Sequence, residues 1–310
     1  MISTYSSARG AASDAASGQH YPPGTLYVVA TPIGNLADIT LRALHLLGLV
    51  DAMACEDTRH TQTLLRAYGI DKSSAQLIAV HQHNEAQAAQ SVIERLRQGQ
   101  RVAYASDAGT PAISDPGARL VAAVRNAGLP VVPLPGVSSV TTVLSVAGIG
   151  GEGAQNGAFV FAGFLSSKFT ERAHEVQALA NEARAVVLLE APHRIEALAS
   201  ALAVLGERSL TIGRELTKQF EEIATVPSAA FAAWLAADAN RCRGEFALVL
   251  HPAVVIAETG AEQRILKMLM DELPLKTAVK LTADITGASR NALYDAALAL
   301  KNTGKPGKSA

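Results

Sequence analysis

A twelve-residue segment of small, acidic and turn-forming residues, 106–117, is the part of the chain best suited to holding a ligand. It reads Ser-Asp-Ala-Gly-Thr-Pro-Ala-Ile-Ser-Asp-Pro-Gly and follows the strand-like residues 101–105. Small side chains let a ligand approach the backbone, and open α/β folds bind ligands at the carboxyl ends of their strands. The carboxylates of Asp107 and Asp115 favour a cationic or zwitterionic ligand over a phosphate. A sulfonium-bearing amino acid fits this description; the alternative is an Asp-Pro-Gly turn without a ligand.

Polar residues also follow the second and third predicted strands. Glu56, Asp57 and Arg59 come directly after residues 52–55. So dense a group of polar side chains suggests a functional site, but a helix N-cap with a local ion pair explains them equally well. His81 and His83 follow residues 77–80, and their one-residue spacing is not a familiar metal-ligand arrangement. We therefore predict no metal site.

Two further turns at strand ends are candidates for ligand binding in the first half. Pro32 lies in the turn after residues 26–30, and Ser138 and Ser139 open a helix after residues 131–134. Hydroxyls and free N–H groups at a helix start can hold a carboxylate, although a plain N-cap serine is the more frequent case.

Basic residues follow strands in the second half of the chain. His193 and Arg194 come after residues 185–189, and Arg214 and Lys218 come after residues 210–213. They could contact a phosphate backbone. The alternative is that they only pair with neighbouring glutamates, namely Glu190, Glu215, Glu221 and Glu222.

The alternation of strand-like and helix-like segments predicts an α/β fold with a parallel or mixed sheet covered by helices. Strands are expected at 26–30, 52–55, 77–80, 102–105 and 131–134, and again at 159–163, 185–189, 210–213, 223–226 and 246–250. Helices are expected between them, with glycines as C-terminal stops.

This pattern divides the 310 residues into four parts. Residues 1–24, rich in Ser, Ala and Gly, are expected to be a disordered tail. Residues 25–150 form a first αβα domain and residues 157–252 a second, with a glycine-rich boundary between them. Residues 260–303 form a helical appendix, because only helices are expected there.

The appendix is basic, whereas the net charge of the whole chain is −1. From Arg264 onward there are eight basic and four acidic residues. Residues 276–301 have the order helix, short turn, helix, which is typical of helix-turn-helix units that bind nucleic acid. The alternatives are an αα-hairpin docked on the second domain and a merely solvated helical surface.

Composition narrows the class of protein further. The two cysteines, Cys55 and Cys242, lie far apart without metal-ligand spacing, so neither a disulfide framework nor a zinc site is expected. No apolar run reaches the length of a membrane span, and no secretory signal is evident. The sequence predicts a cytoplasmic protein.

Several motifs together resemble the tetrapyrrole methylase superfamily, and within it the family of small-subunit ribosomal RNA methyltransferase I. The resemblance runs from about residue 25 to residue 252. Its motifs are TLYVVATPIGNLADIT (25–40), EDTRHT (56–61), HNE (83–85), SDAGTPAISDPG (106–117), PHRI (192–195), RELTK (214–218) and GE (244–245).

The resemblance implies two αβα domains, S-adenosylmethionine as cofactor, a homodimer, and methylation of a cytidine ribose 2′-hydroxyl in the decoding region of 16S ribosomal RNA, within the small subunit. It assigns cofactor binding to residues around the acidic segment: Pro32, Asp107, Gly109, Ile113, Ser138, Ser139 and Phe164. RNA binding falls to Arg59, Arg194, Arg214 and Lys218. Candidates for the base or a positioning role are Asp107, Glu56, Asp57 and His193.

Two other functions stay open. A methyltransferase of a tetrapyrrole such as a precorrin would share the fold and the cofactor, but it would need no basic appendix. A non-catalytic ribosome-binding protein would transfer no methyl group at all.

Overall fold

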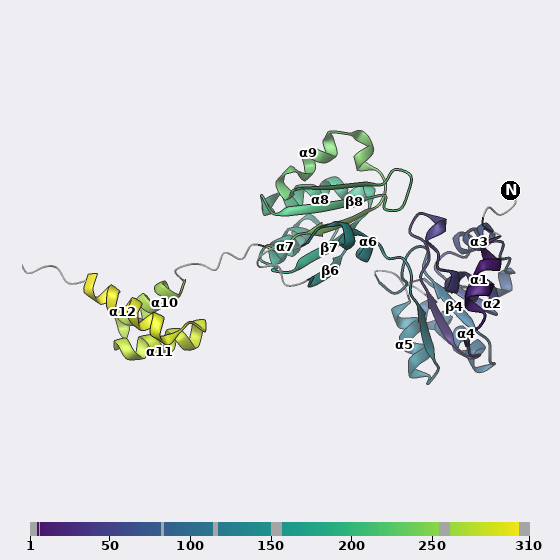
Figure 1. Ribbon diagram of the computed structural model, residues 1–310, viewed down its shortest axis with the longest axis horizontal. Helices are drawn as coiled ribbons and strands as arrows, with labels where there is room; N and C mark the ends of the chain where they lie inside the picture. Colours follow the sequence, from purple (N-terminus) through teal and green to yellow (C-terminus); the bar gives the residue numbers. More distant parts are fainter. Residues whose placement is uncertain are drawn as a thin grey trace, which may run out of the picture. The chain divides into compact units, whose positions relative to one another are not determined.

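The computed structural model describes residues 5, 7–81, 84–113, 117–149, 157–253 and 261–303. His83, residues 114–116 of the acidic segment, with Asp115 among them, and the glycine-rich residues 150–156 lie outside the described residues. The chain divides into two compact units, residues 1–253 and residues 254–310, which are described separately below (Figure 1).

The first half of unit 1 is built on a parallel sheet with the strand order β3-β2-β4-β1-β5. Both β2 and β4 are buried at every position, which is expected for parallel strands covered on both faces. Because all five strands run the same way, their carboxyl ends lie at one edge. The strands are β1 (Leu26–Val29), β2 (Ala52–Cys55), β3 (Leu77–Ala79), β4 (Val102–Ala105) and β5 (Val131–Leu134).

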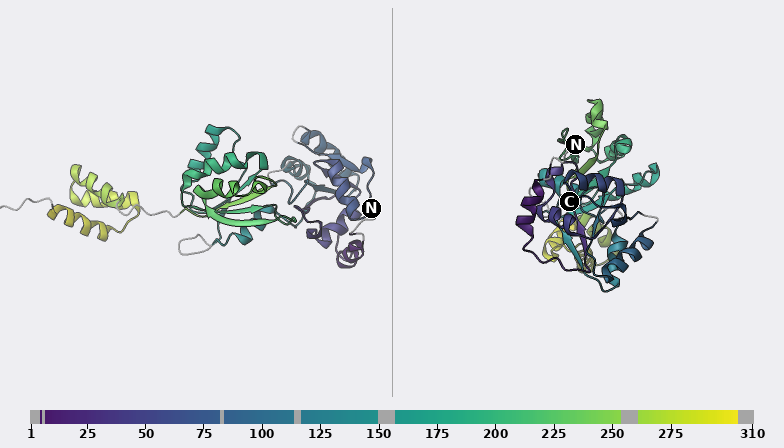
Figure 2. Two further views of the ribbon diagram at one scale, coloured as in Figure 1. Left: turned by 90° about the horizontal axis from the view of Figure 1, so that it is seen from above. Right: turned by 90° about the vertical axis from the view of Figure 1, so that its right-hand side faces the viewer.

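Helices cover both faces of this sheet (Figures 1 and 2). Alternate residues of β1 separate the two cores: Tyr27 and Val29 pack with helices α2 and α3, whereas Leu26 packs with α4 and α5. The helices are α2 (Leu41–Leu49), α3 (Thr58–Ala67), α4 (Glu85–Arg97) and α5 (Ala118–Asn126); the next helix, α6 (Ser139–Val146), packs on the second sheet instead.

The second half of unit 1 contains a mixed sheet with the strand order β6-β7-β10-β8-β9. Only β6 and β7 are parallel neighbours; the other pairs are antiparallel. Strands β6, β7 and β8 therefore end at the edge where β9 and β10 begin. The strands are β6 (Phe159–Gly163), β7 (Ala185–Glu190), β8 (Ser209–Arg214), β9 (Glu222–Pro227) and β10 (Phe246–Leu250).

Different helices cover the two faces of the second sheet. Helices α7, α8 and α9 form a core on one face with Leu188, Ile212 and Leu248. The other face packs against α6, through Val140 and Val143. Since α6 follows β5 directly, it joins the two halves. The new helices are α7 (Phe169–Leu179), α8 (Ile195–Leu202) and α9 (Phe231–Ala236).

The expectation of a disordered tail over residues 1–24 is wrong for the described part of that segment. Helix α1 (Ala8–Ala16) packs on the first core, with Ala12 and Ala16 buried. Arg9 Nη1 donates a hydrogen bond to Gly69 O at 2.8 Å. Alanines four residues apart lie on one helix face, and their small side chains allow close packing. In the sequence, the abundance of Ser, Ala and Gly in this segment suggested disorder instead.

The described part of unit 2, residues 261–303, consists of three helices with a core of their own. The core contains Leu266, Val279 and Leu293, one from each helix. Gly287 has a φ of +73° and ends the second helix in the left-handed region, where glycine is favoured. The helices are α10 (Ala261–Glu272), α11 (Leu275–Thr286) and α12 (Arg290–Thr303).

The predicted fold class, two sheets of αβα type followed by helices, is confirmed. None of the helices in the described part of the chain has both the length and the apolar character needed to span a bilayer.

Candidate active site

A pocket of about 220 Å³ lies where the two sheets of unit 1 present their strand ends. From the first half it is lined by residues that follow β1, β4 and β5. From the second half it is lined by residues at the ends of β6, β7 and β8 and at the start of β10. The lining residues include Ile33, Gly109, Ile113, Ser138, Ser139, Phe164, Glu190, Leu216, Lys218 and Glu245. The volume lies below the roughly 300–1,000 Å³ that is typical of small-molecule sites.

Five of the seven predicted cofactor residues line this pocket: Gly109, Ile113, Ser138, Ser139 and Phe164. The backbones of Gly109 and Thr31 exchange two hydrogen bonds of 2.9 and 3.0 Å, which fix the loop after β4 against the end of β1. Gly109 has a φ of +77°, and a Cβ there would lie 3.3 Å from Ile33 Cγ2. The backbone therefore approaches the pocket closely only because residue 109 is glycine.

Ser138 is the N-cap residue of α6, but its side chain makes no capping hydrogen bond. The start of this helix thus offers a hydroxyl and backbone N–H groups at the pocket wall.

Pro32 and Asp107 are not among the described residues that line the pocket. Pro32 is buried. Asp107 belongs to the loop after β4, and its Oδ1 accepts a hydrogen bond from Asp57 N at 3.2 Å. The contact joins the ends of β2 and β4, which are neighbours in the sheet.

The four candidates for the base have different surroundings. Burial and the charge of Asp107 raise the pKa of Glu56, although a hydrogen bond with the backbone of Asp107 opposes the shift. Asp57 is the N-cap of α3, and hydrogen bonds from Arg59 N and His60 N lower its pKa. His193 is exposed and does not line the pocket. None of the four candidates is among the described residues that line the pocket. Glu56 and Asp107 lie together, Asp57 caps a helix, and His193 is exposed.

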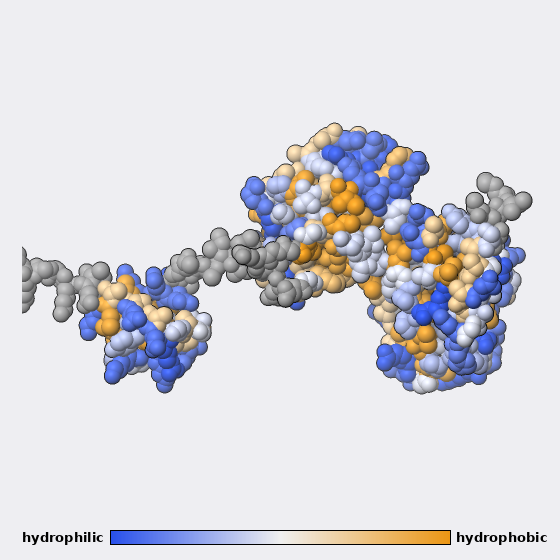
Figure 3. Space-filling model, viewed as in Figure 1, coloured by the Kyte–Doolittle hydropathy of each residue, from blue (hydrophilic) through white to orange (hydrophobic). Residues whose placement is uncertain are grey.

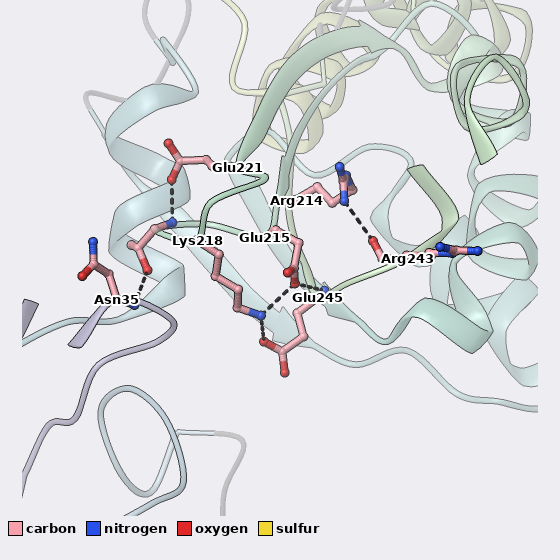
Figure 4. Close-up of polar contacts among 8 residues, drawn as sticks. Asn35, Arg214, Glu215, Lys218, Glu221, Arg243 and Glu245 are labelled. Atoms are coloured by element: carbon pink, nitrogen blue, oxygen red, sulfur yellow. Dashed lines mark hydrogen bonds and ion pairs between the residues drawn. The ribbon is translucent and has the colours of Figure 1, made fainter. Parts of the chain in front are cut away.

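Lys218 lies between two carboxylates at the pocket wall (Figure 4). Its Nζ donates to Glu215 Oε1 at 2.7 Å and to Glu245 Oε2 at 2.9 Å. Burial lowers the pKa of Lys218, but the hydrogen bonds with these two carboxylates outweigh it and the pKa is raised. Lys218 is therefore an ammonium ion and not a proton acceptor at neutral pH.

The loop that carries Lys218 is strained and touches the first half of unit 1. Glu215 and Thr217 have φ values of +51° and +67°, in the left-handed region. Such conformations are costly outside glycine and cluster at functional sites. Thr217 Oγ1 accepts a hydrogen bond from Asn35 N at 3.2 Å. A Cβ on Gly34 would lie 2.4 Å from Lys218 Cγ, so glycine is needed for this contact.

The other predicted RNA contacts differ in accessibility. Arg194 Nε lies 3.1 Å from Glu190 Oε1, and Arg194 also donates to Leu165 O. Arg214 Nε lies 3.5 Å from Glu222 Oε2, and only 9% of the Arg214 side chain is exposed. Arg59 is 91% exposed and lies 3.6 Å from Asp57. Arg194, Arg214 and Lys218 therefore each pair with a neighbouring glutamate.

Sequence reasoning did not assign Glu190, Leu216 or Glu245 to the ligand site. Their positions in the sequence could have indicated this site, since each of them lies at or next to the end of a predicted strand. What the sequence does not reveal is that β10 lies antiparallel between β7 and β8, which brings its first residues to the same edge.

The described residues contain no group of three or more His, Cys, Asp or Glu side chains placed to hold a metal ion. S-adenosylmethionine, by contrast, fits the residues present. Gly109, with a φ of +77° and no Cβ, opens the backbone of its loop to the pocket, and Ser138 makes no capping hydrogen bond with its hydroxyl at the pocket wall.

The fold and the pocket define a methylase of the tetrapyrrole type. The family model for tetrapyrrole (corrin/porphyrin) methylases matches residues 25–232, and the model for the RsmI C-terminal HTH domain matches residues 257–301. Among solved structures, a cobalt precorrin-4 methyltransferase is 17% identical with a TM-score of 0.55, over 74% of this chain and 98% of that one. A uroporphyrin-III C-methyltransferase from Thermus thermophilus is 20% identical with a TM-score of 0.52, over 74% of this chain and 94% of that one.

Proteins related in sequence show which family of these methylases the chain belongs to. Ribosomal RNA small subunit methyltransferase I of Neisseria meningitidis serogroup A is 48% identical over 90% of this chain and 94% of its own. The protein of that name from Escherichia coli O157:H7 is 45% identical over 89% of this chain and 95% of its own. The chain therefore belongs to the ribosomal RNA small subunit methyltransferase I family and is a methyltransferase.

Proposed function

We propose that this protein transfers a methyl group from S-adenosylmethionine to the ribose 2′-hydroxyl of a cytidine in the decoding region of 16S ribosomal RNA. The observation that carries the proposal is the pocket between the strand edges of the two sheets, in a chain that is 48% identical to a ribosomal RNA methyltransferase. The small-subunit substrate is inferred from the names of the relatives.

We propose that Gly109, Ile113, Ser138, Ser139 and Phe164 bind the cofactor, since all five line the pocket. Pro32 and Asp107, which are not among the described residues lining the pocket, are proposed to support this site indirectly. The cofactor supplies an already activated methyl group on its sulfonium. The protein then has to align the ribose oxygen with that group and accept the hydroxyl proton.

Glu56 is our preferred candidate for the proton acceptor. Its pKa is raised by burial and by Asp107, and a carboxylate with a raised pKa is a better general base. Asp57 is less suited because it caps α3 and its pKa is lowered. Lys218, an ammonium ion at the pocket, is proposed to hold an RNA phosphate or the ribose oxygen.

For RNA binding we propose a division of roles among the four predicted basic residues. Arg59 is exposed and Lys218 lines the pocket, so these two are proposed to contact RNA. Arg194 and Arg214 are proposed to stabilise the strand ends through their ion pairs. The helices of unit 2 are proposed to add affinity for RNA, because residues 257–301 match a helix-turn-helix model.

We also propose that the protein is a cytoplasmic homodimer. Apolar areas are visible on one face of unit 1 (Figure 3), and large apolar side chains such as Val146 and Phe159 are more than 40% exposed. Light scattering on the purified chain should give twice the monomer mass of 32.3 kDa. A monomer at micromolar concentration would contradict the dimer.

The function is tested with S-adenosylmethionine labelled in its methyl group. The full chain is incubated with 30S subunits, with naked 16S RNA, or with a tetrapyrrole, and the RNA is digested to nucleosides. We expect label in 2′-O-methylcytidine. Label in the tetrapyrrole would support the precorrin-type alternative, and no transfer to any substrate would favour a binding protein.

A further inference from the structure

The side chain of Glu215, the first residue of the loop between β8 and β9, is held by two donors at a single oxygen (Figure 4). Its Oε1 accepts hydrogen bonds from Lys218 Nζ at 2.7 Å and from Glu245 N at 2.9 Å. The backbone is tied as well, because Glu215 N donates to Glu245 O at 2.9 Å. Only 19% of the Glu215 side chain is exposed, against 75% for Glu245, the second carboxylate on Lys218. Glu215 is therefore the firmer support of the Lys218 ammonium.

Two glycines make room for this arrangement. Gly244 has a φ of +87°, and a Cβ there would lie 2.4 Å from Glu215 Cγ. Gly34, in the turn after β1, makes the same close approach to Lys218 Cγ. Glu215 itself has a φ of +51°, which costs energy for a residue other than glycine. A strained backbone and two close glycine contacts fix where the ammonium lies, as is required of a group that must be placed accurately.

The charges around Lys218 determine which kind of ligand it can hold. An ammonium has three N–H donors, and Glu215 and Glu245 take two of them, so one remains. Lys218 lines the pocket, and 28% of its side chain is exposed. The ammonium and its two carboxylates together carry one negative charge in excess, which opposes a phosphate but not an uncharged hydroxyl. The remaining donor therefore suits a neutral oxygen.

We propose that Lys218 donates its remaining hydrogen bond to the ribose 2′-oxygen of the RNA, and that Glu215 is the positioning residue that holds the ammonium there. This rests on the proposed function. During transfer that oxygen takes the methyl group from the sulfonium, leaving S-adenosylhomocysteine, and gives its proton to the base. Negative charge develops on the oxygen as the proton leaves, so a donor fixed at that atom lowers the barrier. Lys218 keeps its own proton, because its pKa is raised.

The competing explanation is that Glu215 only stabilises its loop. Glu221 provides a matched control, because it also holds this loop by accepting a hydrogen bond from Thr217 N at 2.6 Å. Within the described part of the chain, its carboxylate forms no ion pair with Lys218. Glu221→Gln removes one carboxylate from the same loop and keeps an oxygen that can accept the hydrogen bond from Thr217.

The experiment measures kcat and KM for methyl transfer to 30S subunits, for wild type, Glu215→Ala, Lys218→Met, the double variant and Glu221→Gln. We expect Glu215→Ala and Lys218→Met each to lower kcat about tenfold or more, as for a lost hydrogen bond to a charged group. The double variant should fall no further than Lys218→Met, since Glu215 acts through Lys218. Glu221→Gln should keep the kcat of wild type.

Two further variants separate positioning from folding. Glu215→Gln, whose amide oxygen still accepts from Lys218, should lose less kcat than Glu215→Ala. Glu215→Asp tolerates the left-handed backbone but is one methylene too short to keep its hydrogen bond with Lys218. It replaces Glu215→Ala if that variant fails to fold.

The KM for 30S subunits and the affinity for S-adenosylmethionine in calorimetry should stay near those of wild type. A KM raised by Lys218→Met, with a shallower salt dependence, would assign Lys218 to an RNA phosphate, and weaker cofactor binding would assign it to the cofactor. Either result would overturn the proposal. So would wild-type kcat in folded Glu215→Ala, or losses that multiply in the double variant. Failure of wild type to methylate 30S subunits would overturn the proposed function as well.

Discussion

Glu56 and Asp107 are far apart in the sequence but lie together because β2 and β4 are adjacent strands. Asp107 accepts a hydrogen bond from the backbone of Asp57, while its charge helps to raise the pKa of Glu56. At the scale of single residues, substitutions at this pair of carboxyl groups and at Gly109 are expected to have measurable effects on stability, cofactor binding and methyl transfer.

Replacing Glu56 by Gln should change stability and activity in opposite directions. A carboxyl whose pKa is raised by folding destabilises the folded state once the pH exceeds its unfolded pKa. The melting temperature of Glu56→Gln should therefore rise relative to wild type between about pH 4 and about pH 7. If Glu56 accepts the proton, methyl transfer should fall by about a hundredfold or more.

The control is Asp57→Asn, which keeps a good N-cap residue and should retain most of the transfer rate. Near wild-type transfer by a folded Glu56→Gln protein would rule out Glu56 as the base.

Gly109→Ala should lower both stability and cofactor affinity. At a φ of +77° the alanine is strained, and its Cβ would press on Ile33 Cγ2 at 3.3 Å. The matched control is Gly128→Ala, which has a φ of +75° but nothing within 4 Å of the added Cβ. Both variants should lose about 1 kcal/mol of stability from backbone strain. Only Gly109→Ala should bind S-adenosylmethionine more weakly in calorimetry; equal affinities would remove Gly109 from the cofactor site.

At the scale of elements, local patterns predicted the strands well because each is a short apolar run ended by turn residues. The predicted strand at 102–105, for example, coincides with β4. The order of the strands in each sheet could not be predicted in the same way. The antiparallel position of β10 between β7 and β8, for example, depends on pairing between residues far apart in the sequence. Gly109 of the acidic segment lines the pocket, as does Glu190. The sequence did not assign Glu190 to the site, because its place there depends on which strand ends share an edge.

Helix α1 shows why composition alone misleads. Its serines, glycines and alanines suggest disorder, but Ala12 is completely buried against the first core. Ala12→Leu should destabilise unit 1 by about 1–3 kcal/mol through overpacking. Ala11→Leu, one position away and exposed, should have little effect. Chemical denaturation monitored by circular dichroism measures both, and equal stabilities would mean that α1 does not pack as described.

At the scale of the whole molecule, the pocket belongs entirely to unit 1, while unit 2 has its own core. A chain truncated after Ala253 should therefore fold and bind S-adenosylmethionine with unchanged affinity. Its affinity for 30S subunits should fall and depend less steeply on salt, because unit 2 is rich in lysine and arginine. Filter binding at several salt concentrations measures this. An unchanged affinity and salt slope would show that unit 2 takes no part in RNA recognition.

The central claim, that the pocket between the two strand edges is the cofactor site, is tested most directly by a crystal structure of the full chain with S-adenosylhomocysteine. We predict that the ligand lies against Gly109 and Ser138 on one side and Phe164 on the other. A ligand bound elsewhere, with this pocket empty, would contradict the account.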